Sequence, residues 1–419
     1  MKQKILLMAV LVFVSVIPFI LFSCGGPVNT NYDPHFDEDG YLIKDSNDIP
    51  FALECPSKIR FYVEVSGSMN GFFRANAPTK FKADVWQILS YYAPATEGVT
   101  ILTNDGTQGA TLSIPQFQTK MNTGGFISSA STKVPLMLQS IIQDLDTDAG
   151  EVAVLISDMK YSPVGAAAPQ VLLTQYSTDI STIFGKFGRA ISLIGATSEF
   201  LDRNGNSVCD TSPYYYLVIG KPEHVAEMRN GISTLLENNG NFIDNIESGF
   251  NYGAPSYAFG IPENGYQFED EPTFLGYDTS FSDTCTIKLK VDLSSYRWAV
   301  TKQELFEKAF QCKAIYGSEV KIGNVEFDIQ NITNKELKRK AIATVDLKLC
   351  NMATDSEVIE WTLQLPDLDI TDFAPYLGGT DENDVTKSFS LENFIKGMFY
   401  GGVISSSLNP NYILISKNS

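Results

Sequence analysis

Histidine is nearly absent from this chain of 419 residues, which contains only His35 and His224. A nucleophilic serine or cysteine needs a well-placed base, and neither histidine has a sequence context that suggests this role. Metal sites built from several histidines are excluded as well. The scarcity of histidine therefore argues against several classes of enzyme.

Cysteine and positive charge are also scarce. The six cysteines show no C-x-x-C spacing, so the sequence indicates neither a zinc site nor a disulfide framework. The formal net charge of −18 argues against nucleic-acid binding and against polybasic attachment to a membrane. With 44% hydrophobic and 19% charged residues the chain is globular, and it is long enough for two domains.

The N-terminus has the pattern of a secretory signal. Two lysines precede an apolar run over residues 5–22, which ends in "LFSC" at Cys24. This ending resembles the lipobox of bacterial lipoproteins. The resemblance implies a signal peptide over residues 1–23, a lipidated Cys24, and anchoring in the outer membrane of the cell envelope, on its periplasmic or surface side. The alternative is a membrane-spanning anchor, since the run reaches the lower end of spanning length.

Residues 24–54 are rich in Gly, Pro, Asn and Asp and predict a flexible tether. Residues 55–240 then alternate strand and helix patterns, which indicates an α/β domain with a doubly wound, Rossmann-type parallel sheet. We expect strands at 59–65, 98–103, 151–157, 190–196 and 214–220, and helices at 80–92, 132–145, 171–187 and 223–240.

Hydroxyl and carboxylate side chains follow the expected strands. Glu64, Ser66 and Ser68 lie at the end of the first strand, and Asp158 lies at the end of the third. Thr132 opens the helix between them. In such sheets ligands bind beyond the carboxyl ends of the strands, so we expect these oxygens to converge. Oxygen ligands completed by water are what Mg²⁺ accepts.

This set resembles the von Willebrand factor A family, whose metal-ion-dependent adhesion site reads D-x-S-x-S, then a threonine, then an aspartate. The resemblance covers about 180 residues and is strongest at "VSGSM" and "VLISD". It implies that Ser66, Ser68 and Thr132 bind Mg²⁺ (or Mn²⁺ or Ca²⁺) through their hydroxyls and that Asp158 binds directly or through water. Glu64 replaces the aspartate of the family. Its longer side chain still reaches a bound water or a serine hydroxyl, but it moves the carboxylate outward.

Simpler explanations exist for each residue alone. Ser66 and Ser68 are also typical of a strand-ending turn that caps a helix, and Asp158 of a cap on the next segment. The segment 201–210 has a Ca²⁺-loop-like start but lacks the bidentate glutamate. We interpret it as a turn-rich insertion.

Beyond residue 240 the character changes. Residues 241–283 form a linker rich in Gly, Pro and aromatic residues, and residues 284–419 form a C-terminal β-rich domain. Alternating patterns at 285–293, 324–329, 341–349 and 358–365 indicate an antiparallel, sandwich-like sheet. Helices are expected at 301–311 and 390–403, and a closing strand at 411–417. Five linker aromatics either stack on sugars or pack against a neighbouring domain: Tyr252, Tyr257, Phe259, Tyr266 and Phe268.

The preferred function is an envelope-anchored adhesion or scaffold module, not an enzyme, that grips a carboxylate of a protein partner through its cation. One alternative is a metal-assisted hydrolase with Ser66 or Thr132 as the nucleophile and Asp158 holding the ion. The sequence contains no G-x-S-x-G elbow, however, and the only bases nearby in sequence are Lys133 and Lys160. The other alternative is a glycan-binding lipoprotein that uses the aromatic linker and the β domain.

Overall fold

The computed structural model describes residues 35–36, 42–43, 54–103, 105–126, 132–161, 169–250, 257–259, 265–268, 271–278, 284–293, 303–330, 340–352, 354–364, 368–378, 384–402 and 411–418. The expected signal peptide and Cys24 lie outside these residues, as does most of the expected tether. Two short strands, β1 (His35–Phe36) and β2 (Leu42–Ile43), pair antiparallel. None of the described helices is both long and apolar enough to cross a membrane.

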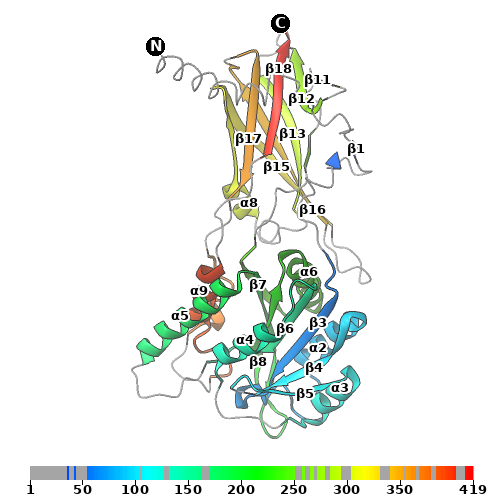
Figure 1. The fold of residues 1–419 in the computed structure, drawn as a ribbon, viewed down its shortest axis with the longest axis vertical. Coiled ribbons are helices and arrows are strands. Elements are labelled where there is room, and N and C mark those ends of the chain that lie inside the picture. Colours follow the sequence, from blue (N-terminus) through cyan, green and yellow to red (C-terminus); the bar gives the residue numbers. More distant parts are fainter. Residues whose placement is uncertain are drawn as a thin grey trace, which may run out of the picture.

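An α/β domain is built on a seven-stranded sheet in the order β5-β4-β3-β6-β8-β7-β9 (Figure 1). Its strands are β3 (Lys58–Glu64), β4 (Thr96–Leu102), β5 (Gln108–Leu112), β6 (Glu151–Ser157), β7 (Ala190–Leu201), β8 (Ser207–Gly220) and β9 (Phe242–Ser248). Strand β3 runs parallel to β4 and β6. The four other pairs, β4–β5, β6–β8, β7–β8 and β7–β9, are antiparallel, so the sheet is mixed.

The expectation of a parallel sheet is therefore wrong for four of the six strand pairs, and the connection between β7 and β8 explains the direction of the pair that these two strands form. These strands are joined by a tight turn and not by a helix, and a hairpin connection requires antiparallel strands. The Asp202 carboxylate accepts the backbone N–H groups of Asn204 at 2.8 Å and Asn206 at 2.9 Å. Gly205 supplies the positive φ of +84°. The turn-rich interpretation is confirmed for residues 202–206, whereas residues 207–210 belong to β8.

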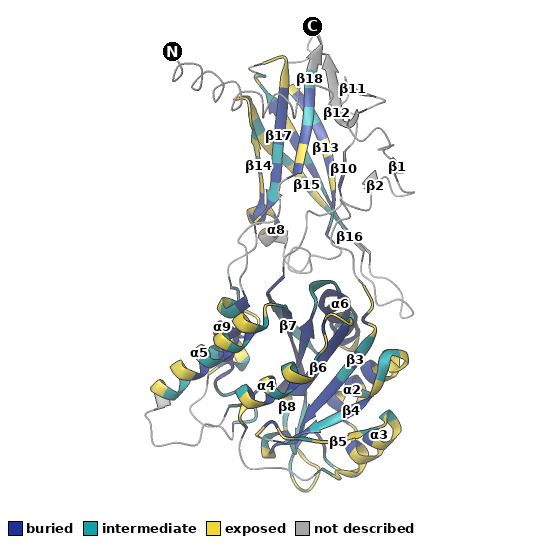
Figure 2. Ribbon diagram, viewed as in Figure 1, coloured by how far each residue is buried: buried dark blue, intermediate teal, exposed yellow. Residues whose placement is uncertain are grey.

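Helices cover both faces of this sheet. One face carries α2 (Lys80–Tyr91), α3 (Ile114–Thr123) and α6 (Pro222–Asn239); the other carries α4 (Val134–Asp144), α5 (Pro169–Phe187) and α9 (Leu391–Gly402). Alternation along β3 sends Phe61 and Val63 into the first layer and Tyr62 into the second. Strand β6 is buried along its whole length (Figure 2). A continuous apolar run is what a strand covered on both faces requires.

The β domain contains two further sheets, in the orders β10-β13-β16-β15 and β11-β12-β18-β17-β14. Their strands are β10 (Tyr257–Phe259), β11 (Gly265–Phe268), β12 (Glu271–Asp278), β13 (Thr284–Asp292), β14 (Phe310–Ala314), β15 (Glu319–Gln330), β16 (Lys340–Cys350), β17 (Ser356–Leu363) and β18 (Asn411–Asn418). All pairs are antiparallel except β12 with β18. The rings of Tyr257 on β10 and Trp361 on β17 lie 5.2 Å apart, so the two sheets pack face to face. Helix α8 (Gln303–Ala309) precedes β14.

The domain boundaries differ from those expected. The expected linker 241–283 includes β9, which pairs with β7 of the α/β sheet, and strands β10 to β12 of the β domain. The 3₁₀ helix η3 (Ala374–Tyr376) and α9 lie within the expected β-rich domain, but they pack on the α/β domain, α9 against α5. The chain thus leaves the α/β domain after β9, returns with η3 and α9, and leaves again into β18. The apolar face of α9 explains this, because Phe394 and Met398 are fully buried against that layer.

Candidate metal site at the ends of strands β3 and β6

Strands β3 and β6 end at the same edge of the sheet because they are parallel neighbours, with Val63 opposite Ile156. The chain after β3 turns through a short 3₁₀ helix, η1 (Gly67–Met69). Asp158 directly follows β6, and Thr132 lies just before α4. The structure therefore brings the segments that carry all five expected ligands to one edge.

Glu64 is the centre of this arrangement. Its side chain is fully buried, and Thr132 Oγ1 donates a hydrogen bond of 2.9 Å to Oε1. Ser157 Oγ donates to the other carboxylate oxygen, Oε2. Because Thr132 gives its proton to Glu64, the lone pairs of its oxygen remain available to a cation. Glu64 is thus placed to orient hydroxyl ligands.

The two serines after β3 lie in contact with each other. Ser66 Oγ and Ser68 Oγ are 2.8 Å apart, and Ser66 is only 2% exposed. Ser66 occupies the N-cap position of η1, but its side chain makes no capping hydrogen bond there. Helix capping therefore does not explain this serine.

Asp158 has one carboxylate oxygen in use and one without a partner. Oδ1 accepts the backbone N–H of Lys160 at 3.1 Å. Oδ2 is buried and has no hydrogen-bond partner among the described residues. A buried carboxylate oxygen left in this state costs free energy unless a proton or a cation satisfies it. The backbone is fixed as well, because Ser388 Oγ donates to the Asp158 carbonyl at 2.8 Å and Met159 has a φ of +54°.

The electrostatics of the pair favour a positive ligand. Burial and the neighbouring Asp158 carboxylate raise the pKa of Glu64 to about 7. Hydrogen bonds from Ser157, Ser66 and Thr132 act in the opposite direction and only partly offset this rise. In the described part of the chain no basic side chain forms an ion pair with either carboxylate. The donor set of carboxylate and hydroxyl oxygens therefore fits a hard divalent cation.

Two contributors were not expected from the sequence. Ser157 bonds Glu64 and also accepts the Met159 N–H at 2.7 Å. Its position directly before Asp158 was the available signal. Ser388 is separated from Asp158 by 230 positions in the chain, and nothing in the local sequence marks it.

The residues invoked for the alternative functions are placed differently. Lys160 Nζ donates to the carbonyl of Asp384 at 2.8 Å, and Lys133 is an exposed residue at the start of α4. Of the five linker aromatics, Tyr257 is 5% exposed and packs inside the β domain, so it offers no free ring face. Tyr252, and the side chains of Phe259, Tyr266 and Phe268, lie outside the described part of the structure.

Comparison with protein-family models, with curated proteins and with solved structures gives no match to this chain.

Proposed function

We propose that this protein is a binding module and not an enzyme, and that its α/β domain is von Willebrand factor A-like and holds a divalent cation. Mg²⁺ suits the all-oxygen donor set best, and Mn²⁺ or Ca²⁺ are the nearest substitutes. One observation carries the proposal. Among the described residues Asp158 Oδ2 is buried without a hydrogen-bond partner, and Asp158 lies near the Glu64 carboxylate to which Thr132 donates its proton.

Ser66, Ser68 and Thr132 would supply hydroxyl ligands, and Asp158 would supply the carboxylate. Glu64 would hold Thr132 in place and bind a water of the cation shell. The cation itself would supply one position for an external oxygen ligand. A carboxylate of a protein partner is the ligand that such a site would recognise, because it brings the negative charge that a partly neutralised cation still attracts.

The cellular setting belongs to the same proposal. Lipidation of Cys24 would anchor the protein in the outer membrane of the cell envelope, with the residues up to 54 as the spacer. The net charge of −18 is consistent with a protein partner and a cation, and it disfavours nucleic acid.

The test is thermal unfolding of residues 54–419 with and without millimolar Mg²⁺ or Mn²⁺. A ligand that binds only the folded state raises the free energy of unfolding by about 2.7 kcal/mol at a hundred times its Kd. We expect an upward shift of Tm in the wild type and its loss in Ser66→Ala and Asp158→Asn. Ser356→Ala, an exposed serine on β17, is the matched control and should keep the full shift.

If the wild type shows no shift, or if Ser356→Ala and Asp158→Asn respond to Mg²⁺ alike, the cation does not bind at this edge. That result would also exclude the binding of a partner's carboxylate through a cation at this site.

A further inference from the structure

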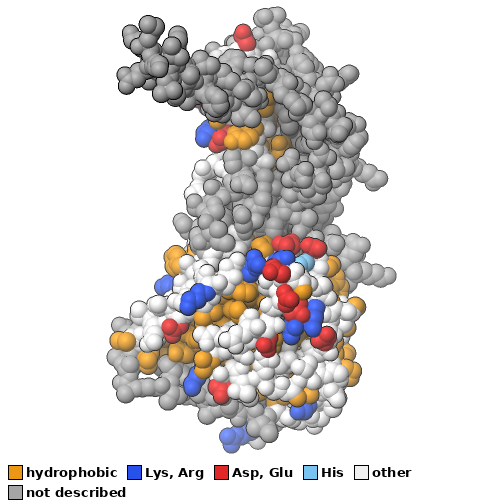
Figure 3. All heavy atoms as spheres, viewed as in Figure 1, with side chains coloured by type: hydrophobic (Ala, Val, Ile, Leu, Met, Phe, Trp, Pro, Cys, Tyr) orange, Lys and Arg blue, Asp and Glu red, His pale blue; other side chains and the backbone are white. Residues whose placement is uncertain are grey.

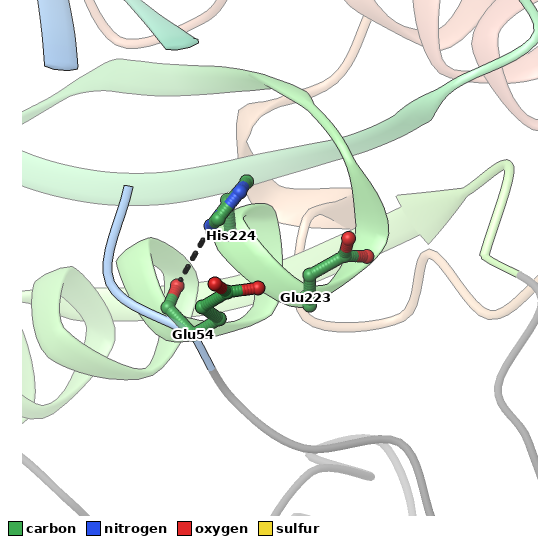
Figure 4. A group of neighbouring side chains, drawn as sticks. All are labelled: Glu54, Glu223 and His224. Carbon is green, nitrogen blue, oxygen red and sulfur yellow. Dashed lines mark hydrogen bonds between the residues drawn. The ribbon is translucent and has the colours of Figure 1, made fainter. Parts of the chain in front are cut away.

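A second group of potential metal ligands lies at the other end of the strands of the same sheet, where β3 and β6 begin. Strand β8 runs antiparallel to β6, so α6, which follows β8, begins where β3 and β6 begin. There Glu54, Glu223 and His224 come together at the first turn of α6 (Figure 4). One ligand atom from each side chain lies within 4.8 Å of the other two.

The histidine of this group is held in place by the backbone. His224 is 5% exposed, and its Nδ1 lies 3.0 Å from the carbonyl oxygen of Glu54. A carbonyl only accepts, so Nδ1 carries the proton and Nε2 keeps the lone pair. Nε2 has no hydrogen-bond partner among the residues that the structure describes. A histidine fixed through one ring nitrogen, with a lone pair on the other, is the arrangement found at metal sites.

The two glutamates are close together without a neutralising partner. The basic side chains around this edge are each paired elsewhere: Lys58 and Arg60 with Glu151, and Arg189 and Lys221 with Asp148. Figure 3 shows Lys and Arg side chains next to Asp and Glu side chains on the face of the α/β domain that this view presents. In the described structure neither Glu54 nor Glu223 forms an ion pair. Two negative charges exceed the partial charge of about +0.5 at the start of a helix, so the group attracts a cation.

We propose that Glu54, Glu223 and His224 form a second divalent cation site, for Zn²⁺ or a related transition metal. One imidazole nitrogen and two carboxylate oxygens, completed by water, suit Zn²⁺ better than Mg²⁺. Ligand bonds of about 2.0–2.2 Å place the ligand atoms of one cation closer together than the 4.8 Å limit within which these atoms lie, so the side chains must be able to approach one another. The exposed side chain of Glu54 and the half-buried side chain of Glu223 have the rotational freedom to do so.

The position of the site gives the cation a structural consequence. The Glu54 N–H also donates to the Glu223 carbonyl at 3.3 Å, so the backbone already joins the start of the α/β domain to α6. Glu54 is the residue at which the expected tether meets this domain. A cation bound here cross-links the end of the tether to the start of α6, two segments that are far apart in the sequence.

The test uses the full chain in detergent, titrated with Zn²⁺ by calorimetry in saturating Mg²⁺, and with Co²⁺ by visible spectroscopy. We expect one Zn²⁺ per chain and Co²⁺ bands of a tetrahedral site. Glu54→Gln and His224→Gln should each lower Zn²⁺ affinity at least tenfold and abolish these bands. Glu54→Gln is the safer variant for folding, because its exposed carboxylate makes no hydrogen bond in the described structure.

His35→Gln is the matched control, because it removes the only other histidine of the chain. His35→Gln should leave Zn²⁺ affinity unchanged. Asp158→Asn should also leave it unchanged, which would show that Zn²⁺ does not bind at the ends of β3 and β6. Wild-type Zn²⁺ affinity in both Glu54→Gln and His224→Gln would overturn the proposal. Loss of binding in His35→Gln would do so as well.

Discussion

Two buried glutamates of this protein have opposite protonation behaviour, and the difference comes from their hydrogen-bond donors. Glu357 accepts the backbone N–H groups of Tyr316 at 2.7 Å and Ser318 at 3.0 Å. Burial raises the pKa of Glu357, but a hydrogen bond from the Ser318 side chain and those from the backbone N–H groups outweigh it, and the net shift is downward. Among the described residues Glu64 receives hydrogen bonds only from hydroxyl groups; burial and the nearby Asp158 carboxylate raise its pKa to about 7. The Ser318 side chain and backbone amides together keep Glu357 ionised, whereas Glu64 needs a proton or a cation.

Glu64 should therefore give stability a distinctive pH dependence. Its folded-state pKa of about 7 lies above the ordinary value of 4.5, so the folded state binds more protons between these pH values. Without divalent cations, its contribution is fully present below pH 4.5 and is lost as the pH rises to 7. The loss is on the order of 3 kcal/mol. We expect denaturant unfolding of Glu64→Gln across this range to lack that slope, and saturating Mg²⁺ to reduce it in the wild type.

Glu357→Gln is the natural comparison because its pKa shift has the opposite sign. The contribution of Glu357 is present above its unfolded-state pKa and is lost as the pH falls. Its removal should therefore lessen the loss of stability in acid. Unfolding profiles of wild type and Glu64→Gln that stay parallel between pH 4.5 and 7 would contradict the raised pKa of Glu64.

At the scale of elements, the contact between α5 and α9 attaches the C-terminal segment to the α/β domain. The helices approach so closely at Gly397 that a Cβ there would lie 2.5 Å from the Ser177 carbonyl oxygen and 2.9 Å from Ile180 Cβ. The nearest atom belongs to the backbone of α5, so no rotation of a side chain can relieve this steric clash. A glycine is required at this position by packing and not by backbone conformation.

Gly397→Ala should destabilise the protein although alanine is the better helix former. Overpacking costs about 1–3 kcal/mol, and the higher helix propensity returns at most about 1 kcal/mol. Tyr400→Ala on the same helix is the control, since Tyr400 is 67% exposed and its loss should change stability by less than about 0.5 kcal/mol. Chemical denaturation measures both. Equal stability of Gly397→Ala and the wild type would mean that α9 does not pack tightly on α5.

Hydrophobic periodicity predicted the bounds of long helices and strands. The residues in the connections between them led to fewer correct predictions. Strand β6 and helix α2 lie within a residue or two of their expected bounds, because their apolar patterns are long and uninterrupted. The direction of β8 was missed, although the Asp, Asn and Gly residues before it already indicated a turn. Strand β5 was missed because a five-residue strand with mostly exposed side chains shows no clear pattern. Helix α3 was missed although Ser113 and Gln116 form a capping box at its start.

At the scale of the whole molecule, the candidate site was only partly predictable. Glu64, Ser66 and Asp158 follow strands, and parallel strands end together, so their shared edge could be inferred. The contribution of Ser388 depends on the path of the chain, which returns from the β domain to the α/β domain before α9. No local pattern encodes that return. The apolar face of α9 says only that the helix is buried, and not against which domain.

This path predicts that the α/β domain is incomplete without its returning segment. A chain that ends at Phe250 lacks α9 and leaves Tyr176, Ile180 and Phe184, all fully buried in the intact protein, without their covering layer. We expect residues 54–250 to bind a hydrophobic dye and to unfold at a lower temperature than residues 54–419.

A peptide of residues 384–402 added in trans to this fragment should raise its unfolding temperature. It also restores the Ser388 bond to Asp158, so it should raise Mg²⁺ affinity if that edge binds the cation. The matched control is the same peptide with Gly397→Ala, which should fail on both measurements because it no longer fits against Ser177. A fragment 54–250 as stable as the longer chain would show that the α/β fold is complete at β9 and that α9 contributes nothing to it.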